Sequence, residues 1–121
     1  MKLEVGMYVR LQNDAENIVI INRIANVFET TILTENNGSI YQGEYTKENV
    51  IKASYDIIDI LEVGDYVNGN KIGYMDDCKG AMKEFYYDYE NPNEDVGHYE
   101  EEIKSIVTKE QFKNMEYRIG E

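Results

Sequence analysis

The sequence is poor in the residues that build disulfides, metal centres and nucleic-acid-binding surfaces. It holds one cysteine (Cys78), one histidine (His98) and one proline (Pro92). A single thiol excludes an internal disulfide and a zinc site built on several thiolates. The 12 lysines and arginines stand against 24 aspartates and glutamates, for a net charge of −12. This balance disfavours direct binding to DNA, RNA or an anionic membrane, because all three bind proteins through stripes of basic residues.

Long hydrophobic runs are also missing. No apolar stretch approaches the roughly 20 residues that a membrane-spanning helix needs. No apolar segment follows residues 1–4, so we expect no signal peptide and a soluble, cytoplasmic protein. The chain has no glycine-rich phosphate loop and no paired metal-ligand motif. We therefore expect no enzymatic activity, no cofactor and no metal site.

One seven-residue phrase occurs twice. Residues 3–9 read LEVGMYV and residues 61–67 read LEVGDYV, so six of seven positions match at an offset of 58 residues. The glycine suits a kinked entry into a short strand, and the Tyr-Val pair after it favours β structure. We predict two small SH3-like barrels, over residues 1–60 and 61–121, packed together because a unit of about 60 residues is marginal alone, or else one fused β structure. Chance similarity of a common strand-entry phrase is the alternative.

The remaining patterns predict a mostly β fold. Residues 18–21 form a nearly continuous apolar run, typical of a buried central strand. Asn-Gly pairs at 37–38 and 68–69 indicate hairpin turns. We predict further strands over residues 81–89 and 99–107.

The C-terminal region predicts one short helix. Thr108 is followed by Gln111 in a capping-box spacing, so a helix is expected from Lys109 to about Met115. Phe112 and Met115 should face inward, three residues apart. Residues 116–119 could add a last strand.

The most unusual stretch is residues 84–102. It holds eight acidic residues, no lysine or arginine, and Phe85 with four tyrosines. A surface that carries only negative charge attracts a basic partner, and tyrosine side chains can anchor that partner. The alternative is a solvated hairpin whose acids only confer solubility. The predicted partner-binding residues are Glu84, Tyr86, Asp88, Tyr89, Glu90, Glu94, Asp95, Tyr99, Glu100, Glu101 and Glu102.

Two phrases carry a family resemblance. Residues 57–69 (IIDILEVGDYVNG) and 103–112 (IKSIVTKEQF) resemble small hypothetical proteins of phages and prophages of Gram-positive bacteria. The resemblance covers about half of the chain and implies a phage setting in the cytoplasm of an infected host. It carries no catalytic residue. The long acidic and aromatic insert at 84–102 departs from that pattern.

Charge, tyrosine placement and the resemblance lead to one functional expectation. A phage-encoded acidic protein of this kind would bind and inhibit a basic, nucleic-acid-handling host defence protein, such as a CRISPR effector, by imitating phosphate charge. The alternative is an oligomeric binder that sequesters a small nucleotide signal of host defence. Such a protein would bind the phosphates of the nucleotide through Arg10, Arg23 and Arg118, the only arginines of the sequence. A third interpretation is a regulatory or structural phage protein.

Two site patterns are weaker. Asn91, Asn93, Asp95 and Glu102 occupy positions 1, 3, 5 and 12 of a calcium-loop spacing, but the glycine falls at position 7 instead of 6. His98 and Cys78 suggest a base and a nucleophile. However, neighbouring aspartates disfavour a thiolate, and no third orienting group is evident. We expect surface or packing roles for both.

Overall fold

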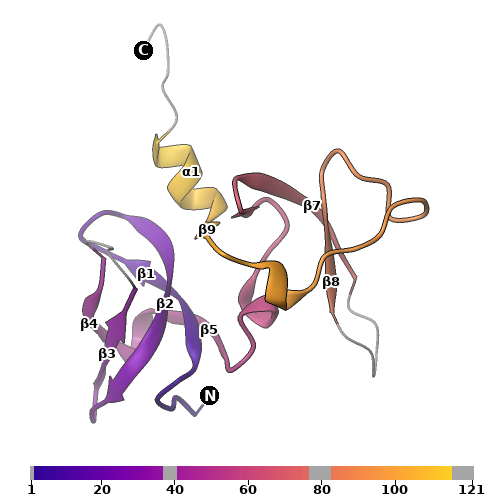
Figure 1. The fold of residues 1–121 in the computed structure, drawn as a ribbon. Helices are drawn as coiled ribbons and strands as arrows, with labels where there is room; N and C mark the ends of the chain where they lie inside the picture. The colour runs from indigo at the N-terminus through magenta and orange to yellow at the C-terminus, as the bar shows by residue number, and fades with distance from the viewer. Residues whose placement is uncertain (1, 37–40, 77–82, 116–121) are drawn as a thin grey trace, which may run out of the picture.

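The computed structural model describes residues 2–36, 41–76 and 83–115. The chain is mostly β, with two antiparallel sheets that lie side by side and one short C-terminal helix (Figure 1). In these ranges no helix has both the length and the apolar character to cross a membrane. The first predicted Asn-Gly turn, at 37–38, and the predicted last strand, at 116–119, lie outside the described residues.

The first sheet contains five strands, and its last strand returns to pair with the first. The order is β4-β3-β2-β1-β5, and η1 (Lys47–Asn49) carries the chain from β4 to β5. The apolar run at 18–21 is confirmed as the buried start of the central strand β2. The strands are β1 (Tyr8–Asn13), β2 (Ile18–Val27), β3 (Thr31–Glu35), β4 (Gly43–Thr46) and β5 (Val50–Ser54). The core side chains are Val9, Leu11, Ile18, Ile20, Ile24 and Ile32.

The second sheet is smaller, in the order β8-β7-β6-β9. A short 3-10 turn, η2 (Ile57–Ile60), leads into it, and another, η3 (Glu100–Glu102), precedes its last strand. Its core also takes in Ile21 from β2, so the two sheets share buried surface. The strands are β6 (Tyr66–Val67), β7 (Asn70–Asp76), β8 (Glu84–Tyr87) and β9 (Ile106–Val107). The other core residues are Ile58, Ile60, Leu61, Val67, Ile72, Phe85 and Tyr87.

Both sheets follow one order of connections. In each, hairpin-connected strands are followed by a 3-10 turn and by a last strand that pairs with the first. The two turns begin at Lys47 and Glu100, 53 residues apart. In each, the N–H of the residue that follows the turn donates to the carbonyl of its first residue. Neither sheet closes into a barrel within the described ranges, so the SH3-like barrels stay a prediction.

The repeated phrase forms the same turn in both halves. Gly6 and Gly64 have φ angles of +95° and +101°, which an L side chain rarely adopts. Their N–H groups donate to the carbonyls of Ile24 and Ile72, both at 2.9 Å. The N–H groups of Ile24 and Ile72 donate back to the residue after each glycine, at 2.8 Å. The phrase therefore sets the first strand against the second in each sheet.

The prediction of a strand over 99–107 is wrong for most of its length. Glu100–Glu102 form η3, and only Ile106–Val107 pair in the sheet. At residues 104 and 105 the reason is a contact with the turn after β6: the Oδ1 atom of Asn68 accepts their N–H groups, at 2.8 and 3.1 Å. Those N–H groups are therefore not available for a ladder with a neighbouring strand.

Helix α1 (Lys109–Met115) is confirmed together with its capping box. The Thr108 N–H donates to Gln111 Oε1 at 3.0 Å, and the Gln111 N–H donates back to Thr108 Oγ1 at 3.1 Å. The Thr108 hydroxyl donates to the Val19 carbonyl of β2. Phe112 does not face inward as predicted, since it is 41% exposed and stacks on Tyr66. The side chain of Met115 lies outside the described residues. The first turn of α1 makes the buried contacts instead.

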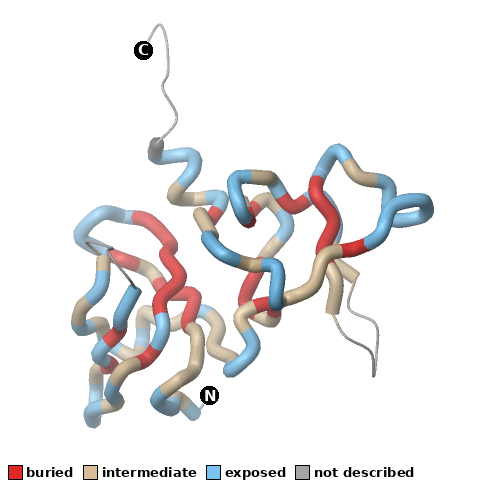
Figure 2. Tube along the Cα trace, viewed as in Figure 1, coloured by how far each residue is buried: buried red, intermediate tan, exposed pale blue. Residues whose placement is uncertain are grey.

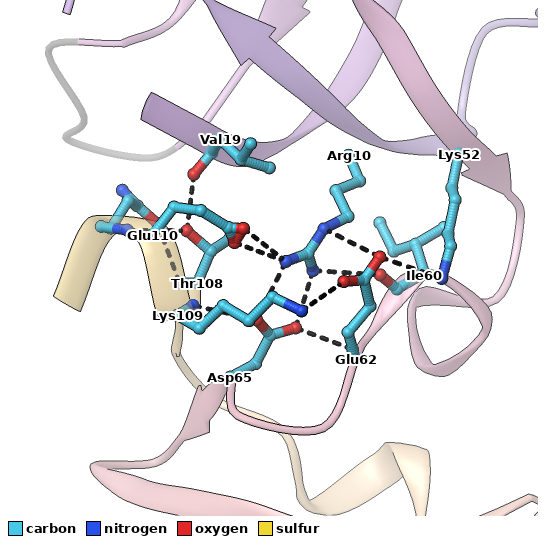
Figure 3. Close-up of polar contacts among 10 residues, drawn as sticks. Arg10, Val19, Lys52, Ile60, Glu62, Asp65, Thr108, Lys109 and Glu110 are labelled. Atoms are coloured by element: carbon cyan, nitrogen blue, oxygen red, sulfur yellow. Dashed lines mark hydrogen bonds and ion pairs between the residues drawn. The ribbon is translucent and has the colours of Figure 1, made fainter. Parts of the chain in front are cut away.

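A buried arginine joins the two halves to α1 (Figure 3). Arg10 on β1 is 1% exposed, and its guanidinium meets Asp65, which is 0% exposed, through two bonds of 2.7 and 3.0 Å. Glu110 of α1 lies 3.0 Å from the same guanidinium, and Glu62 lies 3.4 Å away. Asp65 also accepts the backbone N–H groups of Glu62 and Lys109. This cluster fixes the second sheet and the helix against the first sheet.

Candidate partner-binding face

The residues predicted to bind a partner lie on β8, on residues 88–97, at Tyr99 and on η3 (Figure 1). We call residues 88–97 the acidic loop. Figure 2 shows this loop exposed over most of its length, whereas β8 is largely buried. The predicted face is therefore uneven, because some of its residues belong to the core and others to the surface.

The aromatic residues divide between these two environments. Phe85, Tyr86 and Tyr87 are 0%, 6% and 7% exposed, so they build the second sheet and do not form a docking surface. Tyr89 is 72% exposed and stacks on Tyr87, with ring centroids 5.8 Å apart. Tyr99 is half-buried. Among the tyrosines predicted to bind, Tyr89 is the most exposed.

The Glu84 carboxylate accepts hydrogen bonds from other residues of the fold. It accepts the Tyr86 hydroxyl at 2.8 Å and the Tyr99 hydroxyl at 3.4 Å. This hydrogen bond, with burial and the negative charge, raises the pKa of Tyr86 to about 12. Glu84 also packs on Gly97, where a Cβ atom would lie 2.1 Å from the carboxylate. Glu84 therefore attaches the end of the acidic loop to β8.

Other predicted acids also cap backbone groups. Glu100 accepts the N–H of Ile57 at 2.7 Å and so attaches η3 to η2. Glu102 accepts the N–H of Tyr99 at 2.7 Å and closes η3. Glu90 accepts the N–H of Tyr87 at 2.8 Å. These carboxylates stabilise the shape of the face and are less available to a partner.

Hydrogen bonds within the acidic loop define its shape. The Asn91 N–H donates to the Asp95 carboxylate at 2.6 Å, and the Asn93 N–H donates to Asn91 Oδ1 at 2.9 Å. The N–H groups of Glu94 and Asp95 both donate to the Asn91 carbonyl. Asn91 Oδ1 and one Asp95 carboxylate oxygen, which a calcium loop would turn toward a cation, thus accept backbone N–H groups. No group of three or more acidic, histidine or cysteine side chains in the described ranges could hold a metal ion.

The exposed part of the acidic loop combines charge with apolar surface. Val96 is 80% exposed, close in the chain to Tyr89. Asp88, Glu94 and Glu101 are exposed, and none of these carboxylates is hydrogen-bonded or ion-paired within the described part of the chain. Sequence reasoning missed Val96, and the only available signal was an apolar residue in a run of polar ones.

His98 sits at the base of the acidic loop. Its backbone pairs with Phe85 in an isolated bridge on the side of β8 away from β7. Burial alone would lower the pKa of its ring, but hydrogen bonds to Glu102 and Glu90 outweigh that effect and raise the pKa above 6.5. Cys78 lies outside the described residues, so a pairing of His98 with Cys78 stays untested.

A groove of about 630 Å³ lies between the two halves. Ile57, Ile103 and Ile106 give it an apolar floor, and Arg23 and Lys104 stand among its polar lining residues. Arg23 already pairs with Glu35 at 3.1 Å. Of the three arginines predicted to bind phosphate, Arg10 is buried between the two sheets and Arg118 lies outside the described residues.

Comparisons with protein-family models, with curated proteins and with solved structures find no match to this chain.

Proposed function

We propose that this chain is a non-enzymatic, phage-encoded protein that binds and inhibits a basic, nucleic-acid-handling defence protein of the bacterial host. The carrying observation is the acidic loop, which has a defined shape and presents Tyr89 and Val96 amid exposed carboxylates. Tyrosine is one of the residue types in which interface hot spots are enriched, and the carboxylates around it attract a basic partner. The protein would act in the cytoplasm of the infected cell, in the manner of an anti-CRISPR protein.

The proposed mechanism is nucleic-acid mimicry. A net charge of −12 accelerates the encounter with a basic groove. Asp88, Glu94 and Glu101 then occupy positions where phosphates would bind, while Tyr89 supplies stacking area of the kind that single-stranded bases use. The bound protein blocks the groove sterically, so no chemical step is needed.

The test is affinity capture from host lysate, followed by binding measurements on a charge-reversed variant. Asp88→Lys, Glu94→Lys and Glu101→Lys together reverse three carboxylates that have no hydrogen-bond or ion-pair partner among the described residues. We expect binding to weaken about tenfold or more, and the wild-type affinity to fall as salt rises. The matched control reverses Glu16, Glu29 and Glu48, which are exposed residues of the first half, with the same change in net charge. Equal losses in both variants would refute a localised face.

The groove supports a second candidate, an oligomeric binder that sequesters a small nucleotide. Its volume suits a ligand of that size, and Arg23 and Lys104 could neutralise phosphate charge. Calorimetry with cyclic oligonucleotides would test this candidate against the variant Arg23→Ala. Binding that is lost in Arg23→Ala and is less sensitive to salt than binding of the protein partner would favour the nucleotide.

We also infer that the two sheets are copies of one SH3-like unit, the second of them shortened. The shared order of connections and the matching turns at Gly6 and Gly64 support this inference. The copies would be joined by the shared core at Ile21 and by the Arg10 cluster.

A further inference from the structure

His98 lies between two carboxylates from different segments. Its Nε2 atom is 2.9 and 3.0 Å from the two oxygens of Glu90, which belongs to the acidic loop. Its Nδ1 atom is 3.1 Å from Glu102 Oε1, which belongs to η3. The ring lies against Phe85 and Tyr87, with centroids 5.4 and 4.5 Å away. The only histidine of the chain therefore connects the acidic loop, β8 and η3.

Both carboxylates are held in place by other bonds. Glu90 accepts the Tyr87 N–H at 2.8 Å, and Glu102 accepts the Tyr99 N–H at 2.7 Å. Neither carboxylate can turn away from the ring without losing a backbone hydrogen bond. An ionised carboxylate only accepts hydrogen bonds, so each contact to His98 needs a ring N–H.

A neutral imidazole has one N–H, whereas the imidazolium has two. The geometry around His98 is therefore complete only when the ring carries a proton. Loss of that proton places a nitrogen lone pair against a fixed carboxylate, and one of the two contacts must open. Tyr87 packs on the ring, and Tyr99 and Glu84, which are hydrogen-bonded to each other, are the other titratable groups of the neighbouring segments. The carboxylates of Glu90 and Glu102 favour the protonated ring.

We propose that His98 is a proton-operated latch that holds the acidic loop against η3. With the proton bound, the loop and η3 are fixed to one ring, and Tyr89 and Val96 are presented in one arrangement. Without it, one connection opens and the base of the loop gains freedom. The latch is inferred from the contacts of His98 with Glu90 and Glu102. Its effect on partner binding rests on the proposed function.

The test is an NMR titration between pH 5 and pH 9, because a single histidine gives one ring signal to follow. We expect the ring to titrate above 6.5, with the amide signals of Tyr87, Gly97 and Tyr99 shifting at the same midpoint. Glu90→Gln and Glu102→Gln each keep an acceptor for the backbone N–H, and each should lower the midpoint. In His98→Gln these amides should lose the shared transition, while amides of the first core stay unchanged.

Two results would overturn the latch: loop amides that do not follow the ring, or a midpoint unchanged in both carboxylate variants. Binding is measured separately, with the captured partner at pH 6 and pH 8. If the wild type loses affinity at the higher pH and His98→Gln shows no such dependence, the latch controls presentation of the face. If no partner is captured, the proposed function fails, while the titration still decides the latch.

Discussion

Asp65→Ala should lower the free energy of unfolding by about 3–5 kcal/mol, the cost of removing one partner from a buried ion pair. Asp65 is 0% exposed, and it holds the 1%-exposed Arg10 through two hydrogen bonds. Its loss also leaves the N–H groups of Glu62 and Lys109 without that acceptor, and a buried unsatisfied group costs about 1–3 kcal/mol. Glu110 and Glu62 continue to face the guanidinium, which limits the total.

The assay is urea unfolding followed by circular dichroism and tyrosine fluorescence, because the chain has no tryptophan. The matched control is Glu35→Ala, which removes a carboxylate from the pair with Arg23, where both side chains are 51% exposed. An exposed pair contributes less than about 1 kcal/mol. Asp65→Asn keeps one acceptor oxygen and should fall between the two. Losses that agree within about 1 kcal/mol for Asp65→Ala and Glu35→Ala would refute the idea that this pair joins the halves.

Four further outcomes are expected. Burial raises the pKa of Glu62, but bonds from lysines and the charge of Arg10 lower it to about 2, below its ordinary 4.5. Its stabilisation is therefore present above pH 4.5 and lost as the pH falls toward 2, so Glu62→Gln should flatten that part of the acid-unfolding curve. Thr108→Ala should cost about 1–2 kcal/mol in urea unfolding, and Thr108→Ser should recover most of it; equal losses would contradict the cap. Gly64→Ala should cost about 1–3 kcal/mol in the same assay because φ is +101°, and wild-type stability would contradict the turn. Tyr89→Ala should leave the melting temperature unchanged and weaken binding of the proposed partner; unchanged affinity would exclude Tyr89 from the proposed interface.

The elements with a local chemical signature were predictable from the sequence. The capping box at Thr108 and Gln111 located α1, because both hydrogen bonds form between residues three apart. The Asn68-Gly69 turn was predictable because both residues take positive φ, at 52° and 83°, between the paired strands β6 and β7. The apolar run of β2 located a buried strand.

Features that depend on distant partners were not predictable. Arg10 was interpreted as material for a phosphate grip, since nothing near it in the chain shows that its partners lie 55 and 100 residues away. The composition of residues 84–102 does not distinguish one acidic residue from another. It could not show that Glu100 accepts the Ile57 N–H or that Glu90 faces His98. The sequence thus indicated the location of the candidate face but not which of its carboxylates are exposed.

The position of Arg10 has a consequence for synthesis of the protein. The ribosome makes Arg10 about 100 residues before Glu110, a delay of about 5–20 s at typical elongation rates. During that interval the strands of the first sheet can pair, but its guanidinium has not met all of its carboxylates. A nascent or truncated chain that ends before α1 would also lack the Thr108 contact to Val19. Chains that end before α1 should therefore be cleaved by proteases more readily than chains that contain it.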